Sequence, residues 1–154
     1  MIYPTFVQDY LEDYARLYPD KEALIVDKER WTYFSINFHA DQLGLFLSEM
    51  GIKRGDRVMV YMDNSSEIVI SIYGILKAAG VFAIINSQVQ ANKLSYIIKD
   101  SGASVLITDV SKSDVVEKAL DNVITRCKII WVGSKLSIPK SFKYVFFKST
   151  ISVS

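Results

Sequence analysis

The sequence predicts an α/β protein with a mainly parallel sheet and helices on both faces. From about residue 57 onward, short β-branched runs alternate with helical patterns in the order β-α-β-α-β-α-β, and such alternation is typical of crossover connections between parallel strands. The first of these runs, residues 57–62, is apolar on both of its faces, as strands of parallel sheets usually are. A helix, a short hairpin and a second helix precede the alternation.

The first helix of this lead-in is expected over residues 5–18, with Thr5 as its N-cap. Its apolar residues recur at three- and four-residue steps, as one face of a helix requires. They are Phe6, Val7, Tyr10, Leu11, Tyr14, Leu17 and Tyr18. The hairpin that follows is expected to pair residues 23–26 with residues 30–33.

A second helix completes the lead-in, which covers residues 1–54. Thr32 is its expected N-cap. The helix is expected to run to about residue 50, with Gly51 as its C-terminal stop. The apolar residues of its inner face are Ile36, Ala40, Leu43, Leu47 and Met50.

The most apolar part of the chain begins with the strand over residues 57–62. Asn64 is the expected N-cap of the next helix, and Glu67, three residues later, can complete a capping box. That helix is apolar on nearly every side, so it belongs in a protein core or a membrane. The core is favoured, because Lys77 near the middle of the apolar stretch 68–85 would cost about 2.5–3.5 kcal/mol in a bilayer and residues 81–85 are typical of a strand.

The remaining elements continue the alternation, so residues 55–154 are predicted to form one parallel α/β unit. They are a helix over residues 92–100, a strand over 104–108, a helix from Ser111 or Ser113 to about 122, and strands over 128–132 and 143–147.

Composition excludes several classes of function. The charges are balanced, with 18 Lys+Arg against 17 Asp+Glu, and they are scattered along the chain, which argues against a nucleic-acid partner. Cys127 is the only cysteine, so no internal disulfide can form and a reducing compartment is favoured. The N-terminus lacks the pattern of a signal peptide, which makes the cytoplasm the expected location. Half of the residues are hydrophobic, which suggests an apolar surface meant for a neighbour.

Three polar residues are expected at the carboxyl ends of the strands, where open parallel sheets bind ligands. These residues, Asp63, Asn86 and Asp109, could hold a ligand's hydroxyl groups or a metal, but helix caps and turns use the same residue types and are the favoured interpretation. His39, the only histidine, lies in a predicted helix without metal-ligand spacing. Cys127 is interpreted as a packing residue rather than a nucleophile.

Known phosphate-binding motifs are missing from the sequence. No predicted strand is followed by G-x-G-x-x-G or G-x-x-x-x-G-K-S/T. The loop over residues 63–67 contains no glycine and carries two acids, so a nucleotide phosphate would meet unfavourable charge there.

Several segments together carry a family resemblance. They read YPDKEAL at residues 18–24, WTYFSI at 31–36, GIKRGDRVMV at 51–60, NSSE at 64–67, LKAAGVFAIIN at 76–86 and YIIKDSGASVLITD at 96–109. In order and spacing they resemble the N-terminal portion of AMP-forming adenylating enzymes, the superfamily of acyl-CoA synthetases, carrier-protein acyl ligases and peptide-synthetase adenylation domains. The sequence departs from the usual motif residues of that family at four positions. Ser35 stands in place of Glu, Ala79 in place of Gly, and Ile84 and Ser87 in place of Pro.

The resemblance implies a two-step ligase. A carboxylic acid would react with ATP, assisted by Mg²⁺, to give an acyl-adenylate, and coenzyme A or a carrier protein's pantetheine would then accept the acyl group. In such enzymes the catalytic motifs lie further along the chain, so the resemblance transfers no catalytic, cofactor-binding or metal residue to this sequence. Residues 1–154 are therefore expected to be inactive alone and to bind no cofactor.

Two rival interpretations stay open. The chain could be a non-catalytic interaction or scaffold module that keeps the fold, in which case its apolar content would form an interaction surface. An unrelated flavodoxin-like binding domain is a further alternative. Self-association of a truncated chain is compatible with the adenylating-enzyme interpretation, and a membrane span is not expected.

Overall fold

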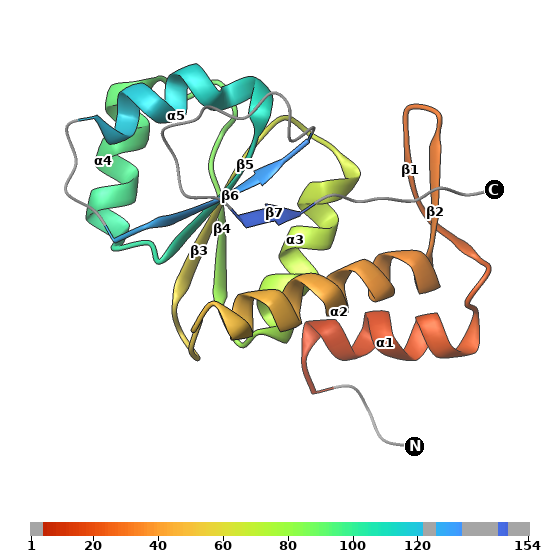
Figure 1. The fold of residues 1–154 in the computed structure, drawn as a ribbon. Coiled ribbons are helices and arrows are strands. Elements are labelled where there is room, and N and C mark those ends of the chain that lie inside the picture. Colours follow the sequence, from red (N-terminus) through yellow and green to blue (C-terminus); the bar gives the residue numbers. More distant parts are fainter. Residues whose placement is uncertain (1–4, 122–125, 134–144, 148–154) are drawn as a thin grey trace. The chain divides into compact units, whose positions relative to one another are not determined.

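The computed structural model describes residues 5–121, 126–133 and 145–147. The chain divides into two compact units, shown together in Figure 1. The helical unit comprises Met1–Gly55 and Asn64–Gly80, and the sheet unit comprises Asp56–Asp63 and Val81–Ser154. The helix after the first parallel strand thus groups with the two lead-in helices.

The predicted hairpin of the helical unit is confirmed. Strand β1 (Glu22–Val26) pairs antiparallel with β2 (Glu29–Thr32). Asp27 in the turn has a φ of 51°, a left-handed conformation that aspartate tolerates better than most residues because its short side chain can bond locally.

Helix α1 spans Val7–Leu17, and the prediction of Thr5 as its N-cap is wrong. The N-cap is Phe6, and the carboxylate of Asp9 accepts the backbone N–H groups of Thr5 and Phe6, both at 2.9 Å. The bond to Phe6 is the return half of a capping box, in which the side chain at N3 accepts the backbone N–H of the N-cap residue. Of the seven apolar residues that predicted this helix only Leu11 is buried, and the other six are 42–61% exposed.

Helix α2 (Tyr33–Glu49) confirms Thr32 as an N-cap, since the Thr32 hydroxyl accepts the backbone N–H of Ser35 at 3.1 Å. The Ser35 hydroxyl donates back to the carbonyl oxygen of Thr32 at 2.9 Å. Serine thus supplies a second side-chain bond at the position where the family usually has glutamate. The buried face of α2 is as predicted, except that Gly44 belongs to it and Met50 is only half-buried.

Helix α3 spans Ser66–Lys77, and its N-cap is Ser65 rather than the predicted Asn64. The helix begins one residue later than a capping box from Asn64 would need, so Glu67 is not three residues from the cap and cannot close that box. The Ser66 hydroxyl instead donates to Oε2 of Glu29 in β2 at 3.1 Å. This contact ties the hairpin to the start of the helix.

Two glycines allow α2 and α3 to approach closely. A Cβ at Gly74 would lie 2.9 Å from the Leu43 Cβ, and a Cβ at Gly44 would lie 3.0 Å from the Lys77 Cβ. Real Cβ atoms do not reach the first of these distances. At this crossing the backbone of each helix at its glycine therefore packs against a side chain of the other helix. Any larger residue at Gly44 or Gly74 would push the two helices apart.

The two helices end in the same way, with a left-handed residue after the C-cap. In α2 this residue is Gly51 (φ 90°), and in α3 it is Ala79 (φ 59°). The N–H of Ala79 donates to Leu76 O at 3.0 Å and that of Gly80 to Ile75 O at 2.9 Å, which is the bond pair of a Schellman motif. Alanine thus occupies a conformation that suits glycine.

This geometry predicts opposite effects at the two helix ends. Ala79→Gly is expected to raise the free energy of unfolding by about 0.5–1 kcal/mol, because relief of the left-handed conformation exceeds glycine's entropic cost. Gly51→Ala, the matched reverse change, should lower it by a similar amount. Urea unfolding of both variants measures the effects, and equal signs for the two changes would contradict this account.

The sheet unit confirms the predicted parallel α/β class. Its sheet runs in the order β4-β3-β5-β6-β7, and every neighbouring pair is parallel. The strands are β3 (Arg57–Tyr61), β4 (Val81–Ile84), β5 (Val105–Asp109), β6 (Lys128–Val132) and β7 (Val145–Phe147). Each predicted strand of this region is therefore present. Residues 143–144 of the last one lie outside the described residues, and every other predicted end lies within one residue of the observed end.

Helices α4 (Ala91–Ser101) and α5 (Ser113–Leu120) pack beside each other on one face of the sheet (Figure 1). Their inward residues meet the strand residues of this face in one apolar core. The buried members include Met59, Tyr61, Leu94, Ile98, Leu106, Val116, Ala119 and Trp131. In the part of the chain that the structure describes, none of the helices combines the length and hydrophobicity needed to cross a bilayer.

The start of α5 differs from the prediction. A short 3₁₀ helix, η1 (Val110–Lys112), comes first, and Asp109 caps it by accepting the Ser111 N–H at 2.7 Å. Ser113 is the first residue of α5 rather than its cap. The aspartate at the end of β5 thus takes the capping role predicted for a serine, because the turn is tighter than an α-helical start.

Candidate functional site

The best candidate site of the sheet unit lies at the carboxyl edge of β3 and β5. The chain leaves β3 for β4 on one side and then returns to form β5 on the other side. Such a reversal opens a crevice between the diverging connections, where open α/β sheets bind ligands. Of the three residues singled out in the sequence, Asp63 follows β3, Asn86 follows β4, and Asp109 is the last residue of β5.

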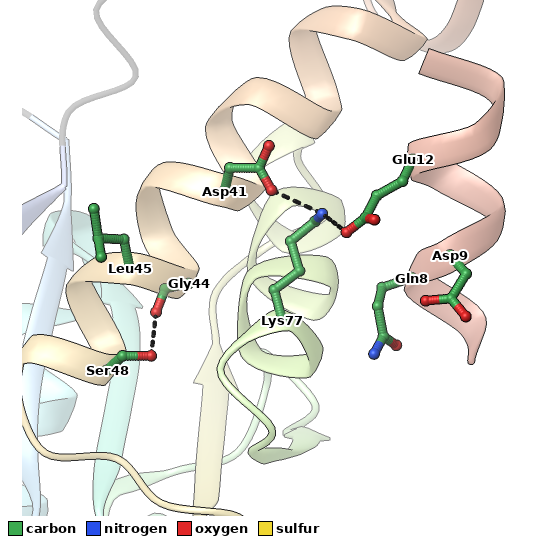
Figure 2. Close-up of a pocket in the computed structure, with 8 residues that line it drawn as sticks. All are labelled: Gln8, Asp9, Glu12, Asp41, Gly44, Leu45, Ser48 and Lys77. Carbon is green, nitrogen blue, oxygen red and sulfur yellow. Dashed lines mark hydrogen bonds and ion pairs between the residues drawn. The ribbon is translucent and has the colours of Figure 1, made fainter. Parts of the chain in front are cut away.

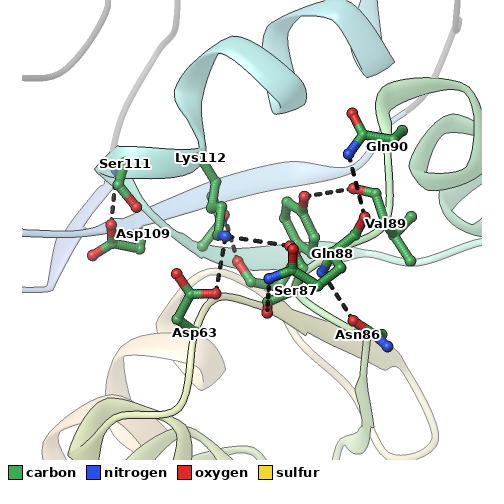
Figure 3. Close-up of polar contacts among 11 residues, drawn as sticks. Asp63, Asn86, Ser87, Gln88, Val89, Gln90, Asp109, Ser111 and Lys112 are labelled. Carbon is green, nitrogen blue, oxygen red and sulfur yellow. Dashed lines mark hydrogen bonds and ion pairs between the residues drawn. The ribbon is translucent and has the colours of Figure 1, made fainter.

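A lysine that the sequence did not reveal occupies the centre of this edge. The ammonium group of Lys112 lies 2.9 Å from Oδ1 of Asp63 and 3.2 Å from the carbonyl oxygen of Ser87 (Figure 3). It also lies 5.9 Å from the centre of the Tyr61 ring, within the range of a cation–π contact. The side chain of Lys112 is only 15% exposed, so the lysine is largely enclosed by these partners.

The other two predicted residues act locally. Asn86 accepts the backbone N–H of Gln88 at 2.9 Å, and Asp109 accepts that of Ser111 at 2.7 Å, as Figure 3 shows. These bonds support the interpretation of Asn86 and Asp109 as turn and cap residues. Among the three, Asp63 alone is joined to the lysine. A basic residue three positions after a strand end was the only signal in the sequence for this contact.

The charges at the edge shift two pKa values. A hydrogen bond from the Ser87 side chain, and then Lys112, hold the pKa of Asp63 below its usual value. Burial raises the pKa of the Tyr61 phenol, an effect that Lys112 opposes. Both groups therefore keep their ordinary neutral-pH forms, a carboxylate and a neutral phenol whose hydroxyl donates to Val89 O at 2.7 Å.

The lowered pKa of Asp63 predicts a pH-dependent contribution to stability. An acid with a depressed folded-state pKa stabilises the protein above its unfolded pKa, here about 3.8, and this contribution is lost as the pH falls through the lower folded value. Wild type should therefore exceed Asp63→Asn in unfolding free energy at pH 5–7, and the gap should close below about pH 4. Urea unfolding at each pH tests this, and a gap that stays constant down to pH 2.5 would contradict it.

A hollow lies in the helical unit, among α1, α2 and α3 (Figure 2). Its volume of about 390 Å³ would suit a small ligand, but ligand pockets are usually lined by apolar groups. Here the lining is Gln8, Asp9, Glu12, Asp41, Gly44, Leu45, Ser48 and Lys77. Lys77, 9% exposed, pairs with Glu12 of α1 and lies 2.8 Å from Asp41 of α2. The hollow is therefore a place where the three helices are tied together by charge.

His39 and Cys127 do not form reactive centres. The Nδ1 atom of His39 lies 2.7 Å from the Ser35 carbonyl oxygen one helical turn away, and its ring packs edge-on to Trp31. Burial raises the pKa of Cys127 to about 12, so its thiol stays protonated at neutral pH. Throughout residues 5–121, 126–133 and 145–147, no cluster of three or more His, Cys, Asp or Glu could hold a metal.

Comparison with known proteins places this fold in a family. The AMP-binding enzyme family matches residues 11–143. The chain is 32% identical to the long-chain-fatty-acid–CoA ligase of Bacillus subtilis (strain 168), over 90% of this chain and 25% of that protein. It is 33% identical to zwittermicin A synthase ZmaJ of Bacillus cereus, over 94% of this chain and 29% of that protein.

A solved structure of a CoA ligase has a similar fold. The anthranilate CoA ligase AuaEII, determined in complex with anthranoyl-AMP, superposes with a TM-score of 0.81 at 25% identity, over 91% of this chain and 27% of that one. The chain thus spans less than a third of each of these three relatives. Because the family match takes in both units and the strand order is that of a parallel α/β protein, the chain belongs to the AMP-binding enzyme family.

Proposed function

We propose that residues 1–154 are the N-terminal portion of the large adenylating domain of an ATP-dependent carboxylate ligase. The observation that carries this proposal is the family match over residues 11–143, combined with relatives three to four times longer whose names are those of ligases and synthases. Residues 1–54 form the lead-in and residues 55–154 the parallel α/β part of that domain. The single cysteine favours a cytoplasmic enzyme.

The proposed reaction has two steps. A carboxylate oxygen of the substrate attacks the α-phosphorus of ATP, so that a P–O bond forms and pyrophosphate leaves. The sulfur of coenzyme A or of a carrier protein's pantetheine then attacks the acyl carbon, so that a C–S bond forms and the thiol proton is released, and AMP leaves with the electron pair of the broken C–O bond. When bound, Mg²⁺ would offset the phosphate charge in the first step.

The described residues do not fit a nucleotide at the carboxyl edge. The segment between β3 and α3 contains the acid Asp63 and no glycine, so its charge opposes a phosphate and it lacks the glycines that permit close backbone approach. The one lysine at this edge, Lys112, is already paired with Asp63. We therefore assign no step of the reaction to residues of this chain, and propose that later segments supply the ATP site.

The coding sequence after residue 154 provides the first test. A ligase requires a downstream Ser/Thr/Gly-rich loop that ends in Pro-Lys-Gly, followed by adenine- and ribose-binding motifs and a mobile C-terminal domain with its lysine. An immediate stop codon in the parent gene, with no such loop, would overturn the proposal.

A pyrophosphate-release assay provides the second test. The intact parent protein should release pyrophosphate from ATP when supplied with its carboxylic acid, and residues 1–154 alone should not. A panel of acids identifies the substrate class, and coenzyme A and a pantetheine-loaded carrier protein are compared as acceptors. Release by residues 1–154 alone would show that catalysis does not need later segments.

A scaffold function is the second candidate, and the surface of α1 favours it. Six large apolar or aromatic residues of this region are exposed: Phe6, Val7, Tyr10, Tyr14, Leu17 and Tyr18. An apolar surface of this kind is typical of interaction sites. Sedimentation velocity tests the idea, because a monodisperse monomer over a wide concentration range would argue against a surface that needs a partner.

A further inference from the structure

We propose that the carboxyl edge of the sheet unit is a binding site for a primary ammonium group, and that the chain's own Lys112 fills it as an internal ligand. The site consists of the Asp63 carboxylate and the Ser87 carbonyl oxygen (Figure 3), together with the face of the Tyr61 ring. This proposal does not depend on the proposed ligase function, because all of its contacts lie in the sheet unit and none involves ATP or the carboxylic acid substrate.

The partners match the chemistry of an ammonium group. Such a group has three donors, no acceptor and a compact positive charge. Asp63 supplies a charged acceptor at 2.9 Å and Ser87 a neutral acceptor at 3.2 Å, while the Tyr61 ring at 5.9 Å adds the attraction of its π face. This combination of carboxylate, carbonyl and aromatic face would also serve a free primary amine.

Contacts that do not involve Lys112 hold these partners in place. The Tyr61 hydroxyl donates to Val89 O at 2.7 Å, and Thr108 donates to Tyr61 O at the same distance. The Ser87 side chain also lies close enough to Asp63 to lower the pKa of its carboxyl group. The site is therefore preorganised, and its geometry should persist when the lysine side chain is removed.

Occupation by Lys112 has a structural consequence. The lysine joins three segments that are distant in sequence, namely the end of β3, the connection after β4, and η1. These segments surround the crevice in which sheets of this strand order accept ligands. The internal ammonium group thus holds these loops together, and the sheet unit gains stability from its contacts.

Chemical rescue of Lys112→Ala tests the proposal directly. We expect the variant to lower the midpoint of thermal unfolding by about 5 °C, because charge-assisted hydrogen bonds are lost. n-Propylammonium, which has the atoms that the substitution deletes, should at 100 mM restore about 2–3 °C of that loss. Sodium and tetramethylammonium at equal ionic strength should not, since neither donates a hydrogen bond.

Matched variants keep the test decisive. Wild type and Lys118→Ala, which removes an exposed lysine of α5, should gain no stability from propylammonium beyond that given by sodium. In Lys112→Ala/Asp63→Asn the rescue should disappear, because the charged acceptor is gone. If Lys112→Ala is unfolded in buffer, the same titration is followed as recovery of helical circular dichroism. Equal effects of propylammonium and sodium on Lys112→Ala, or rescue that survives Asp63→Asn, would overturn the proposal.

Discussion

Trp131→Ala is expected to lower the free energy of unfolding by about 3–5 kcal/mol. The Trp131 side chain is fully buried in β6, in the apolar core between the sheet and helices α4 and α5. Alanine would lose the transfer free energy of the indole ring and leave a cavity that the surrounding strands cannot close. Native proteins have a free energy of unfolding of only about 5–15 kcal/mol. The variant should therefore retain little of its stability.

Urea unfolding followed by circular dichroism measures this loss, and Trp31 remains as a second fluorescent probe. Tyr96→Ala in α4 is a matched control, since that ring is 59% exposed and its removal should change stability by less than about 0.5 kcal/mol. Similar losses for the two variants would show that the sheet core is not packed around Trp131.

Gly74→Ala is expected to destabilise the helical unit by about 2 kcal/mol, even though alanine is the better helix former by about 1 kcal/mol. The new Cβ would lie 2.8–2.9 Å from three atoms of Leu43, including its Cβ. A Cβ cannot rotate away as the end of a long side chain can, so α2 and α3 would have to separate. The close helix crossing therefore outweighs helix propensity at this position.

A double-mutant cycle separates this clash from a general intolerance of α3 to substitution. In a Leu43→Ala background two of the three clashing atoms of residue 43 are gone and only the Cβ contact remains, so adding Gly74→Ala should cost less than it does in wild type. Leu43→Ala alone should cost about 2–5 kcal/mol, because that side chain is buried. Strict additivity of the two changes would contradict a direct contact between them.

Local patterns in the sequence determined most of the secondary structure. The strand over residues 128–132 and the caps at Thr32 and Gly51 follow from features that lie within a few residues of each other. Apolar alternation, capping hydroxyls and glycines at helix ends each affect the backbone within a few residues. These features can therefore be recognised in a single sequence. The errors at Thr5 and Asn64 were shifts of one residue, because several polar residues near a helix start compete to be its cap.

The order of motifs along the chain, by itself, determined the parallel α/β class and the family, since both depend on the sequence of local elements. Only the tertiary structure decided which side chains meet. Lys112 reaches Asp63 across 49 residues, Gly74 meets Leu43 across two helices, and most of the apolar residues of α1 remain exposed. These contacts depend on the order of strands in the sheet and on helix crossings, which no local pattern of side chains specifies.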